Sequence, residues 1–186
     1  MDDKTYLDVL DYWFRELTPQ DWFVSGDKHD QQVRERFGTL LDKASRGQCD
    51  KWKGSPRGRL ALIIVLDQFP RHIFRAQGRA FATDTMAQKL TIEGIECGAD
   101  KRLNFSEKHF FYMPLMHAED KALQAKSVEM FNGLVEEAQL IAQMALEHAD
   151  IINTYQRFPY RNSALDRPST DEELEFLIVQ KPQFGP

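Results

Sequence analysis

Cysteine is scarce in this sequence, and the usual metal-binding patterns are missing. The chain has 2 cysteines among 186 residues, Cys49 and Cys97, and they do not form a Cys-x-x-Cys pair. A disulfide framework or a zinc knuckle is therefore excluded, and we expect both residues to be reduced, buried thiols. Because there is also no His-x-x-x-His or His-Glu-x-x-His pair, a metal site would have to be assembled from distant positions. We predict no metal.

The common nucleotide and acyl-transfer motifs are also absent. The chain has no Gly-x-x-x-x-Gly-Lys-Ser/Thr loop, no Gly-x-Gly-x-x-Gly and no Gly-x-Ser-x-Gly. His117-Ala118-Glu119 matches half of the zinc-deaminase signature, but the Pro-Cys-x-x-Cys half is missing, which excludes that enzyme class. We predict no cofactor.

Long apolar runs are missing as well. The longest run, Leu60 to Leu66, is far shorter than the ~20 residues of a membrane span. The acidic start Met1-Asp2-Asp3-Lys4 lacks the basic and apolar regions of a signal peptide. We therefore expect a cytoplasmic protein that does not enter a membrane.

What the sequence does contain is enough apolar material for a core. Hydrophobic residues make up 42%, charged residues 28%, and the formal net charge is -5. This composition is typical of a globular protein and predicts a single helical domain over 1–186, with an irregular tail at 180–186.

Apolar residues recur at spacings of three and four, which predicts an all-α fold of about eight antiparallel helices. Ser55-Pro56 indicates the start of a buried central helix that Pro70 stops near Gln68. Thr170 and Glu173 form a capping box before the last helix. The expected helices cover, approximately, 7–17, 28–45, 56–68, 79–96, 106–114, 119–134, a helix after a break at 133–137 that reaches 155, and one from 170 onward.

A Phe-Pro pair beside arginines occurs twice, as Phe69-Pro70-Arg71 and as Arg157-Phe158-Pro159. Each pair is expected to end a helix. If the eight helices alternate in direction, the third and the seventh end on the same side of the stack, so both pairs would lie there. This places a group of polar side chains at one end of the molecule: Arg71, Arg75, Asp84, His117, Glu119, Arg157, Arg161 and Asn162.

Simpler roles are open for several of these residues. An arginine after a helix can bind the last free carbonyls, which would explain Arg71 and Arg157. His148 lies on an apolar stripe, which favours a hydrogen-bonded core histidine. His117 follows a proline break at the start of a helix, where a ligand contact and a capping role are equally compatible with the sequence.

The segment from 51 to 79 is basic in an otherwise acidic chain. Interleaved aromatic residues are compatible with nucleic-acid binding, but solvated loop arginines are the commoner reason for such a pattern, so nucleic acid is disfavoured. The charged residues of this segment are Lys51, Lys53, Arg57, Arg59, Arg71, Arg75 and Arg79, against Asp67 alone.

Several stretches of the sequence, the first Phe-Pro segment among them, resemble a bacterial family known as domain of unknown function 924, which is grouped with tetratricopeptide-like helical folds. The likeness extends almost from end to end, and its most specific part is Asp67-Gln68-Phe69-Pro70-Arg71. The other matching stretches are Val9 to Phe14, Arg36 to Gly38, Ile73 to Arg75, Ala80 to Asp84, Tyr112 to Pro114, His117 to Asp120 and His148 to Asn162.

The resemblance implies a tetratricopeptide-like fold, but it implies no activity. The chain carries Gln156 and Tyr160 where the family usually has glycine and histidine, so a role for that histidine does not transfer. No tetratricopeptide consensus is present, and the likeness to that class is architectural.

Two functional hypotheses follow. In the first, Arg71, Arg75, Asp84, Arg157, Arg161 and Asn162 bind a small anionic molecule, and Asp67, His117 and Glu119 are the acid-base candidates if the protein is an enzyme. In the second, the helices form a non-catalytic module that binds a protein or peptide partner. The sequence leaves the oligomeric state open.

Overall fold

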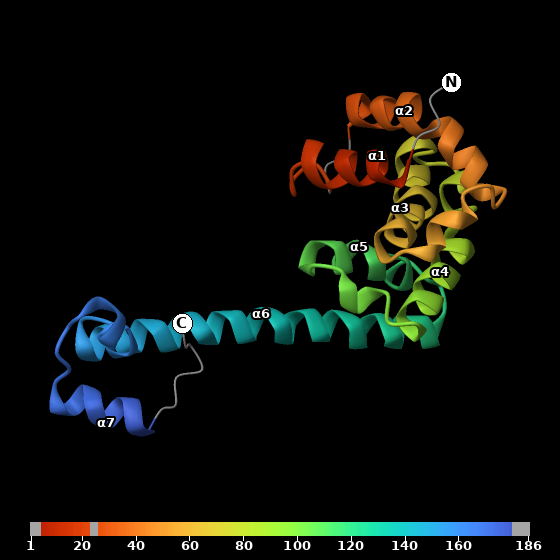
Figure 1. The fold of residues 1–186 in the computed structure, drawn as a ribbon. Helices are drawn as coiled ribbons and strands as arrows, with labels where there is room; N and C mark the ends of the chain where they lie inside the picture. The colour runs from red at the N-terminus through yellow and green to blue at the C-terminus, as the bar shows by residue number, and fades with distance from the viewer. Residues whose placement is uncertain (1–4, 23–25, 180–186) are drawn as a thin grey trace. The chain divides into compact units, whose positions relative to one another are not determined.

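The computed structural model describes residues 5–22 and 26–179, and it confirms the predicted all-α fold. Its regular structure consists of α-helices and short 3-10 or π turns, with no strand in these ranges. The predicted tail at 180–186 lies outside the described residues. The α-helices are α1 (Tyr6–Asp11), α2 (Asp27–Ser45), α3 (Pro56–Ile73), α4 (Asp84–Glu96), α5 (Phe105–Met116), α6 (Lys121–Tyr155) and α7 (Asp171–Val179), as Figure 1 shows.

The chain divides by its internal contacts into two compact units, residues 1–134 and 135–186. We call them unit 1 and unit 2 and describe each by itself. Helix α6 is continuous through the boundary. The expectation of a single domain over 1–186 stays a prediction.

Helix α3 is the central element of unit 1, as predicted. It begins at Pro56 after the N-cap Ser55, whose hydroxyl accepts a hydrogen bond from the Gly58 amide at 3.1 Å. Proline at the first helical position loses no hydrogen bond, and the serine satisfies one of the free amides. The helix packs against α1, α2, α4 and α5, and its residues from Leu60 to Leu66 are almost fully buried.

Pro70 does not stop α3, which corrects the prediction made for the first Phe-Pro pair. The helix runs on to Ile73 with Pro70 inside it. Proline has no amide hydrogen, so the carbonyl of Leu66 loses its helical partner. The buried hydroxyl of Thr83 donates to this carbonyl at 2.5 Å. A side chain from outside the helix thus replaces the missing bond, which the local sequence could not indicate.

Helix α4 ends at Glu96, as predicted, but it begins at Asp84 rather than near 79, whereas the boundaries of α5 are close to those predicted. Gly98 follows α4 with a φ of 69°, the left-handed conformation that glycine adopts without strain. Asn104, rather than Ser106, caps α5, and Glu107 completes the capping box. Pro114 lies inside α5, which continues to Met116, so it does not interrupt the helix.

The predicted break near Gly133 is wrong, because α6 is one helix of 35 residues. A Cβ added at Gly133 would meet nothing within 4 Å. Glycine weakens a helix only by about 1 kcal/mol, so it does not by itself end one. The two helices expected on either side of the break are therefore one helix. The chain reverses direction one time fewer than expected, so the argument that placed both Phe-Pro pairs on the same side no longer holds.

Unit 2 contains the last part of α6, two 3-10 turns called η5 (Pro159–Arg161) and η6 (Ser163–Leu165), and α7. The second Phe-Pro pair follows a helix end, as predicted: Gln156 after α6 has a φ of 57°, and Pro159 opens η5. The capping box of α7 is also confirmed, since the Thr170 amide donates to Glu173 and the Glu173 amide donates to the Thr170 hydroxyl.

Two expectations about side chains are corrected. Cys49 is buried, but Cys97 is exposed. Phe81, expected on the inner face of a helix from 79 to 96, lies in the 3-10 turn η3 (Gly78–Phe81) and is 61% exposed. The turn precedes α4 and therefore does not continue its apolar face.

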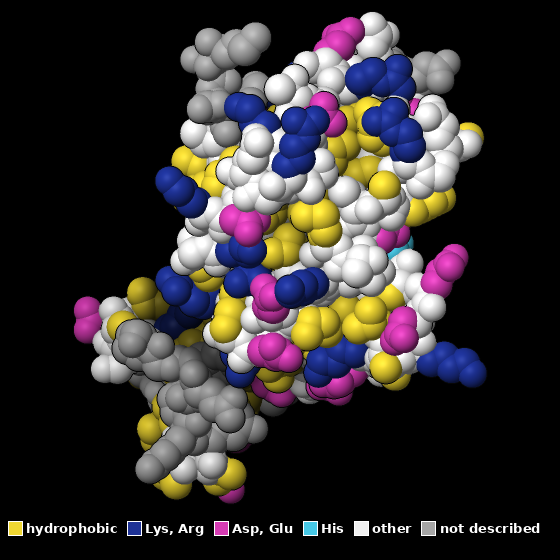
Figure 2. Space-filling model, turned by 90° about the vertical axis from the view of Figure 1, so that its right-hand side faces the viewer, with side chains coloured by type: hydrophobic (Ala, Val, Ile, Leu, Met, Phe, Trp, Pro, Cys, Tyr) yellow, Lys and Arg dark blue, Asp and Glu magenta, His cyan; other side chains and the backbone are white. Residues whose placement is uncertain are grey.

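None of the helices in the part of the chain that the structure describes has the length and hydropathy that a membrane span needs. On the face drawn in Figure 2, dark blue basic and magenta acidic side chains are interspersed around yellow hydrophobic patches.

Candidate functional site

Asp67 is the centre of a polar cluster in unit 1. Its carboxylate lies on α3, is 0% exposed, and is surrounded by donors. Gln68 Nε2 donates to Oδ2 at 2.5 Å, and Arg71 Nη1 lies 3.4 Å from Oδ1. A buried carboxylate is tolerated only when its oxygens are paired in this way.

His117 contacts the same carboxylate from the end of α5. Its Nδ1 atom lies 2.9 Å from Oδ1 and 3.0 Å from Oδ2 of Asp67. An ionised carboxylate only accepts hydrogen bonds, so Nδ1 is the ring nitrogen that donates to Asp67. Nε2 has no partner among the described residues, and the side chain is 22% exposed. The arrangement leaves Nε2 as the proton acceptor of the pair.

The backbone around His117 is held in place by α6. His117 is the C-cap of α5, and its amide donates to the Met113 carbonyl at 3.1 Å. The Gln124 amide group donates to the carbonyls of Met116 and Ala118 at 2.8 and 2.7 Å. The turn that carries His117 is therefore fixed from both sides within unit 1.

Arg71 joins this cluster to α4. Its Nη1 and Nη2 atoms donate to the two carboxylate oxygens of Asp84 at 2.8 and 2.9 Å, which is a bidentate ion pair. Nη1 also donates to the Asp67 carbonyl at 2.5 Å. The guanidinium lies 5.6 Å from the ring centre of the exposed Phe81. Four of the predicted site residues, Asp67, Arg71, Asp84 and His117, are thus brought together.

Glu119 and Arg75 are not part of this cluster. Glu119 is exposed and makes no hydrogen bond or ion pair with any residue that the structure describes. Arg75 donates from Nε and Nη2 to the carboxylate of Asp30 on α2, at 2.5 and 2.7 Å. Arg71 and Arg75, although four residues apart, therefore belong to different clusters.

The second cluster contains residues that the sequence did not indicate. The His72 Nδ1 atom donates to Asp30 at 2.9 Å, and both residues are buried. Burial lowers the pKa of His72 in spite of this carboxylate. Burial alone would raise the pKa of Asp30, but the hydrogen bonds from Arg75 and His72 outweigh it, and the pKa of Asp30 is lowered.

His29 and Tyr12 extend the second cluster. The His29 ring contacts His72 edge-on, with ring centres 4.7 Å apart, and its Nδ1 atom lies 3.3 Å from the Tyr12 hydroxyl. Burial lowers the pKa of His29 and raises the pKa of Tyr12 to about 12. The sequence could have indicated His72 only if the predicted helix had been extended past Pro70, because His72 then lies on the buried face with Phe69.

The predicted residues of unit 2 form a group of their own. Arg157 donates from Nε and Nη2 to Glu173 at 2.6 and 2.8 Å, and Asn162 Nδ2 donates to the same carboxylate at 3.0 Å. The hydrogen bond from Arg157 is the main cause that lowers the pKa of Glu173 to about 2. Arg161 is exposed and lies over the Phe158 ring, 4.5 Å from its centre. Arg157 and Asn162 thus tie the second Phe-Pro segment to α7.

His148 belongs to the same unit. Its ring packs edge-on against Phe158 at 5.7 Å, and its Nδ1 atom lies 2.7 Å from the Met144 carbonyl. It is hydrogen-bonded, as expected, but half-buried rather than in a core. Across the described ranges, no group of three or more His, Cys, Asp or Glu residues is placed to hold a metal ion.

A solved structure with a similar fold is that of a protein of unknown function from Agrobacterium tumefaciens. The two sequences are 34% identical, the match covers 94% of this chain and 97% of the other, and the TM-score is 0.67. No curated protein matches. The profile of a family described as bacterial proteins of unknown function matches residues 9–181, and this chain therefore belongs to that family, DUF924.

Proposed function

We propose that the cluster around Asp67 binds a small molecule and exchanges a proton with it through Nε2 of His117. The observation that carries this proposal is the contact between His117 Nδ1 and the buried Asp67 carboxylate. A carboxylate that holds one ring nitrogen fixes the tautomer and leaves the other nitrogen to act as a base. The second cluster pairs a carboxylate with His72 too, but both of those residues are buried.

The charges of the cluster favour a particular kind of ligand. Asp67 and Asp84 supply two negative charges, Arg71 supplies one positive charge, and a neutral His117 supplies none. The net charge is then negative, and it becomes zero when His117 takes up a proton. The site therefore favours a ligand that donates a proton, such as a hydroxyl compound or a water molecule that attacks a bound ester.

The first hypothesis from the sequence was an anionic ligand. At each predicted arginine except Arg161, a carboxylate of the protein already pairs with the guanidinium and would compete with such a ligand. Arg71 is held by Asp84, Arg75 by Asp30, and Arg157 by Glu173. A phosphate or carboxylate could bind Arg71 only by displacing Asp84 from two hydrogen bonds. Anion binding therefore remains part of the proposal only as binding to Arg71, where the anion replaces the Asp84 carboxylate.

The test is a ligand screen on three proteins: the natural chain, His117→Gln and the control His148→Gln. Melting temperatures are recorded with phosphorylated and carboxylated metabolites and with their uncharged hydroxyl analogues. A ligand at a hundred times its Kd stabilises by about 2.7 kcal/mol, which is on the order of 5 to 10 °C for a chain of this size. We expect at least one compound to stabilise the natural chain and His148→Gln but not His117→Gln.

The same screen decides against the proposal if no compound raises the melting temperature, or if His117→Gln responds like the natural chain. For any compound that is turned over, kcat should fall about a hundredfold or more in His117→Gln, as expected for loss of a general base. An unchanged kcat would remove His117 from the chemistry and leave it a binding residue.

A second candidate function, partner binding, is favoured by one observation in unit 2. Between residues 135 and 150, helix α6 exposes large apolar side chains, and its charged residues are all acidic. Leu140, Ile141 and Met144 share one side of the helix, and exposed apolar residues that lie together can mark an interaction site. The partner that fits is an amphipathic helix with basic flanks. The exposed apolar residues are Val135, Leu140, Ile141, Met144 and Leu146, and the acids are Glu136, Glu137, Glu147 and Asp150.

This candidate is tested with a synthetic amphipathic peptide that carries leucines on one face and lysines beside them. Titration calorimetry should show binding that Ile141→Asp abolishes and that the control Gln139→Asp retains. A peptide with glutamates in place of the lysines should not bind. Equal binding of both peptides, or no binding, counts against a basic partner, and a dimer that dissociates in Ile141→Asp would assign the surface to a second copy.

A further inference from the structure

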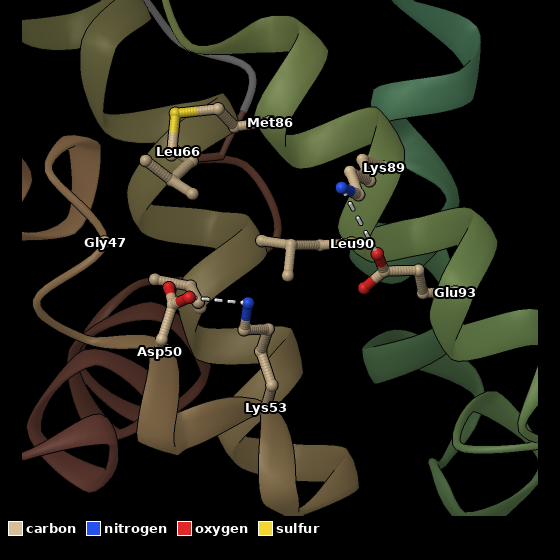
Figure 3. Close-up of a pocket in the computed structure, with 9 residues that line it drawn as sticks. Gly47, Asp50, Lys53, Leu66, Met86, Lys89, Leu90 and Glu93 are labelled. Carbon is tan, nitrogen blue, oxygen red and sulfur yellow. Dashed lines mark hydrogen bonds and ion pairs between the residues drawn. The ribbon is translucent and has the colours of Figure 1, made fainter.

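A groove in unit 1 is lined by residues that belong to neither the Asp67 cluster nor the Asp30 cluster. It has a volume of about 250 Å³ and is lined by α3, α4 and the 3-10 turn η2 (Asp50–Gly54) with the residues before it (Figure 3). Its floor consists of Leu62 and Leu66 from α3 and of Met86 and Leu90 from α4. An apolar floor with a few charged groups at the rim is the usual composition of a small-molecule site.

The rim of the groove carries two ion pairs. On one side, Lys53 Nζ lies 2.7 Å from Asp50, and on the other, Lys89 Nζ lies 3.8 Å from Glu93. Figure 3 shows these pairs on opposite sides of the space that Leu90 enters. The Lys89 pair is the looser one, with the lysine side chain 77% exposed, so it contributes little to stability and can exchange partners.

Glu93 has a second cation beside it. The buried Arg59 lies 3.4 Å from Glu93 and also donates to the Leu90 carbonyl at 3.0 Å. The guanidinium of Arg59 therefore balances the charge of Glu93, while Asp50 balances Lys53. Lys89 is left as the surplus positive charge at the edge of an apolar groove.

We infer that this groove binds a small carboxylic acid with an apolar body, whose carboxylate pairs with Lys89 and whose body covers Leu66, Met86 and Leu90. A volume of about 250 Å³ equals that of about eight water molecules in the liquid, which is the size of hexanoate. An amine of the same length would meet Lys89 with like charge, and an alcohol would lack the ion pair.

The inference is tested by methyl NMR with hexanoate as the probe. Hexanoate should shift the methyl signals of Met86, Leu66 and Leu90, whereas acetate, hexanol and hexylamine should shift them less or not at all. Lys89→Gln should weaken binding by about fivefold, the loss expected for one exposed ion pair, and the control Lys101→Gln should bind like the natural chain.

Three results would overturn it: no shift of these methyl signals at millimolar hexanoate, equal affinity of hexanoate and hexylamine, or unchanged affinity in Lys89→Gln. All three results can be measured on folded protein, because Lys89 is exposed and its replacement leaves the apolar floor of the groove intact. His117→Gln should leave hexanoate binding unchanged, which separates this site from the one proposed around Asp67.

Discussion

At the scale of single residues, the polar clusters of unit 1 are held by arginines that pair with carboxylates on other helices, Arg71 with Asp84 and Arg75 with Asp30. The helix directions expected from the sequence grouped Arg71, Asp84 and His117, and Asp67 was named separately as an acid-base candidate. These four residues form one cluster, although the helix alternation behind the grouping is wrong. The sequence alone could not predict which carboxylate each arginine pairs with, such as Asp30 for Arg75. Asp30 lies in a charged stretch of α2, and only the packing of α2 on α3 distinguishes it from its solvated neighbours.

The buried His72 and the half-buried His29 and His109 give the first prediction, which concerns pH. Burial lowers the pKa of His29, His72 and His109, so these rings are neutral in the folded protein. Below a pH of about 6.5 the unfolded chain takes up these protons first, which favours unfolding. The free energy of unfolding should therefore be level above this pH and fall as the pH drops below it.

Urea unfolding from about pH 8 to about pH 5 measures this dependence. His109→Phe removes one of the three groups and keeps a ring against Phe110 and Phe131, so it should flatten the fall. A stability that rises toward pH 5, or an unchanged slope in His109→Phe, contradicts the assignment of neutral buried rings.

At the scale of elements, some prolines and glycines mark helix boundaries as predicted, such as Pro56 and Gly98, and others do not. Pro70, Pro114 and Gly133 were each expected to end a helix, and each lies inside one. For Pro70 the reason is specific: Thr83 from the N-cap of α4 bonds the carbonyl that proline leaves free. Such compensation depends on another element, so no local rule about proline can anticipate it.

The second prediction tests this compensation with a double-mutant cycle. Thr83→Val removes the hydroxyl and leaves the buried Leu66 carbonyl without a donor, which should cost about 1 to 3 kcal/mol. Pro70→Ala restores an amide that can donate to that carbonyl. In the double variant the loss should therefore be smaller than in Thr83→Val alone, measured by chemical denaturation. Additive effects of the two changes would refute the link between Pro70 and Thr83.

The third prediction compares two helical glycines. A Cβ at Gly94 would overlap the Phe111 ring and lie 2.7 Å from the Arg59 side chain, whereas a Cβ at Gly133 would meet nothing within 4 Å. Gly94→Ala should destabilise by about 1 to 3 kcal/mol through overpacking. Gly133→Ala should stabilise by about 0.5 to 1 kcal/mol, because alanine favours the helix. Destabilisation by Gly133→Ala would mean that α6 is interrupted there.

At the scale of the whole molecule, the all-α fold and the family could be predicted because apolar spacing and the Asp67 to Arg71 phrase are local patterns. The division into two units could not, since it depends on which contacts α6 makes along its length. The apolar residues from 135 to 146 illustrate what the sequence cannot predict. Their spacing predicts a helix, but it does not indicate which part of the protein, or which partner, covers that helix. The tetratricopeptide likeness and a cytoplasmic location stay predictions.

Hydrogen exchange gives the fourth prediction, because the two units differ in buried apolar contacts. Amides of α3, whose apolar side chains are buried on several sides, should exchange most slowly. Those of α6 between 137 and 147, where nearly every residue is exposed, should exchange faster. Mass spectrometry of exchanged peptides measures both. Equal protection of the two segments would show that this part of α6 is covered in solution.

The central claim is that Asp67 holds the ring of His117 so that Nε2 is free to accept a proton. Long-range ¹H–¹⁵N NMR of the histidine rings tests it most directly, because the two ring nitrogens differ in shift when only one carries hydrogen. For neutral His117 we predict hydrogen on Nδ1 and a bare Nε2 that shifts when a ligand binds. Hydrogen on Nε2, or a ring that ignores every ligand that stabilises the protein, would contradict the account.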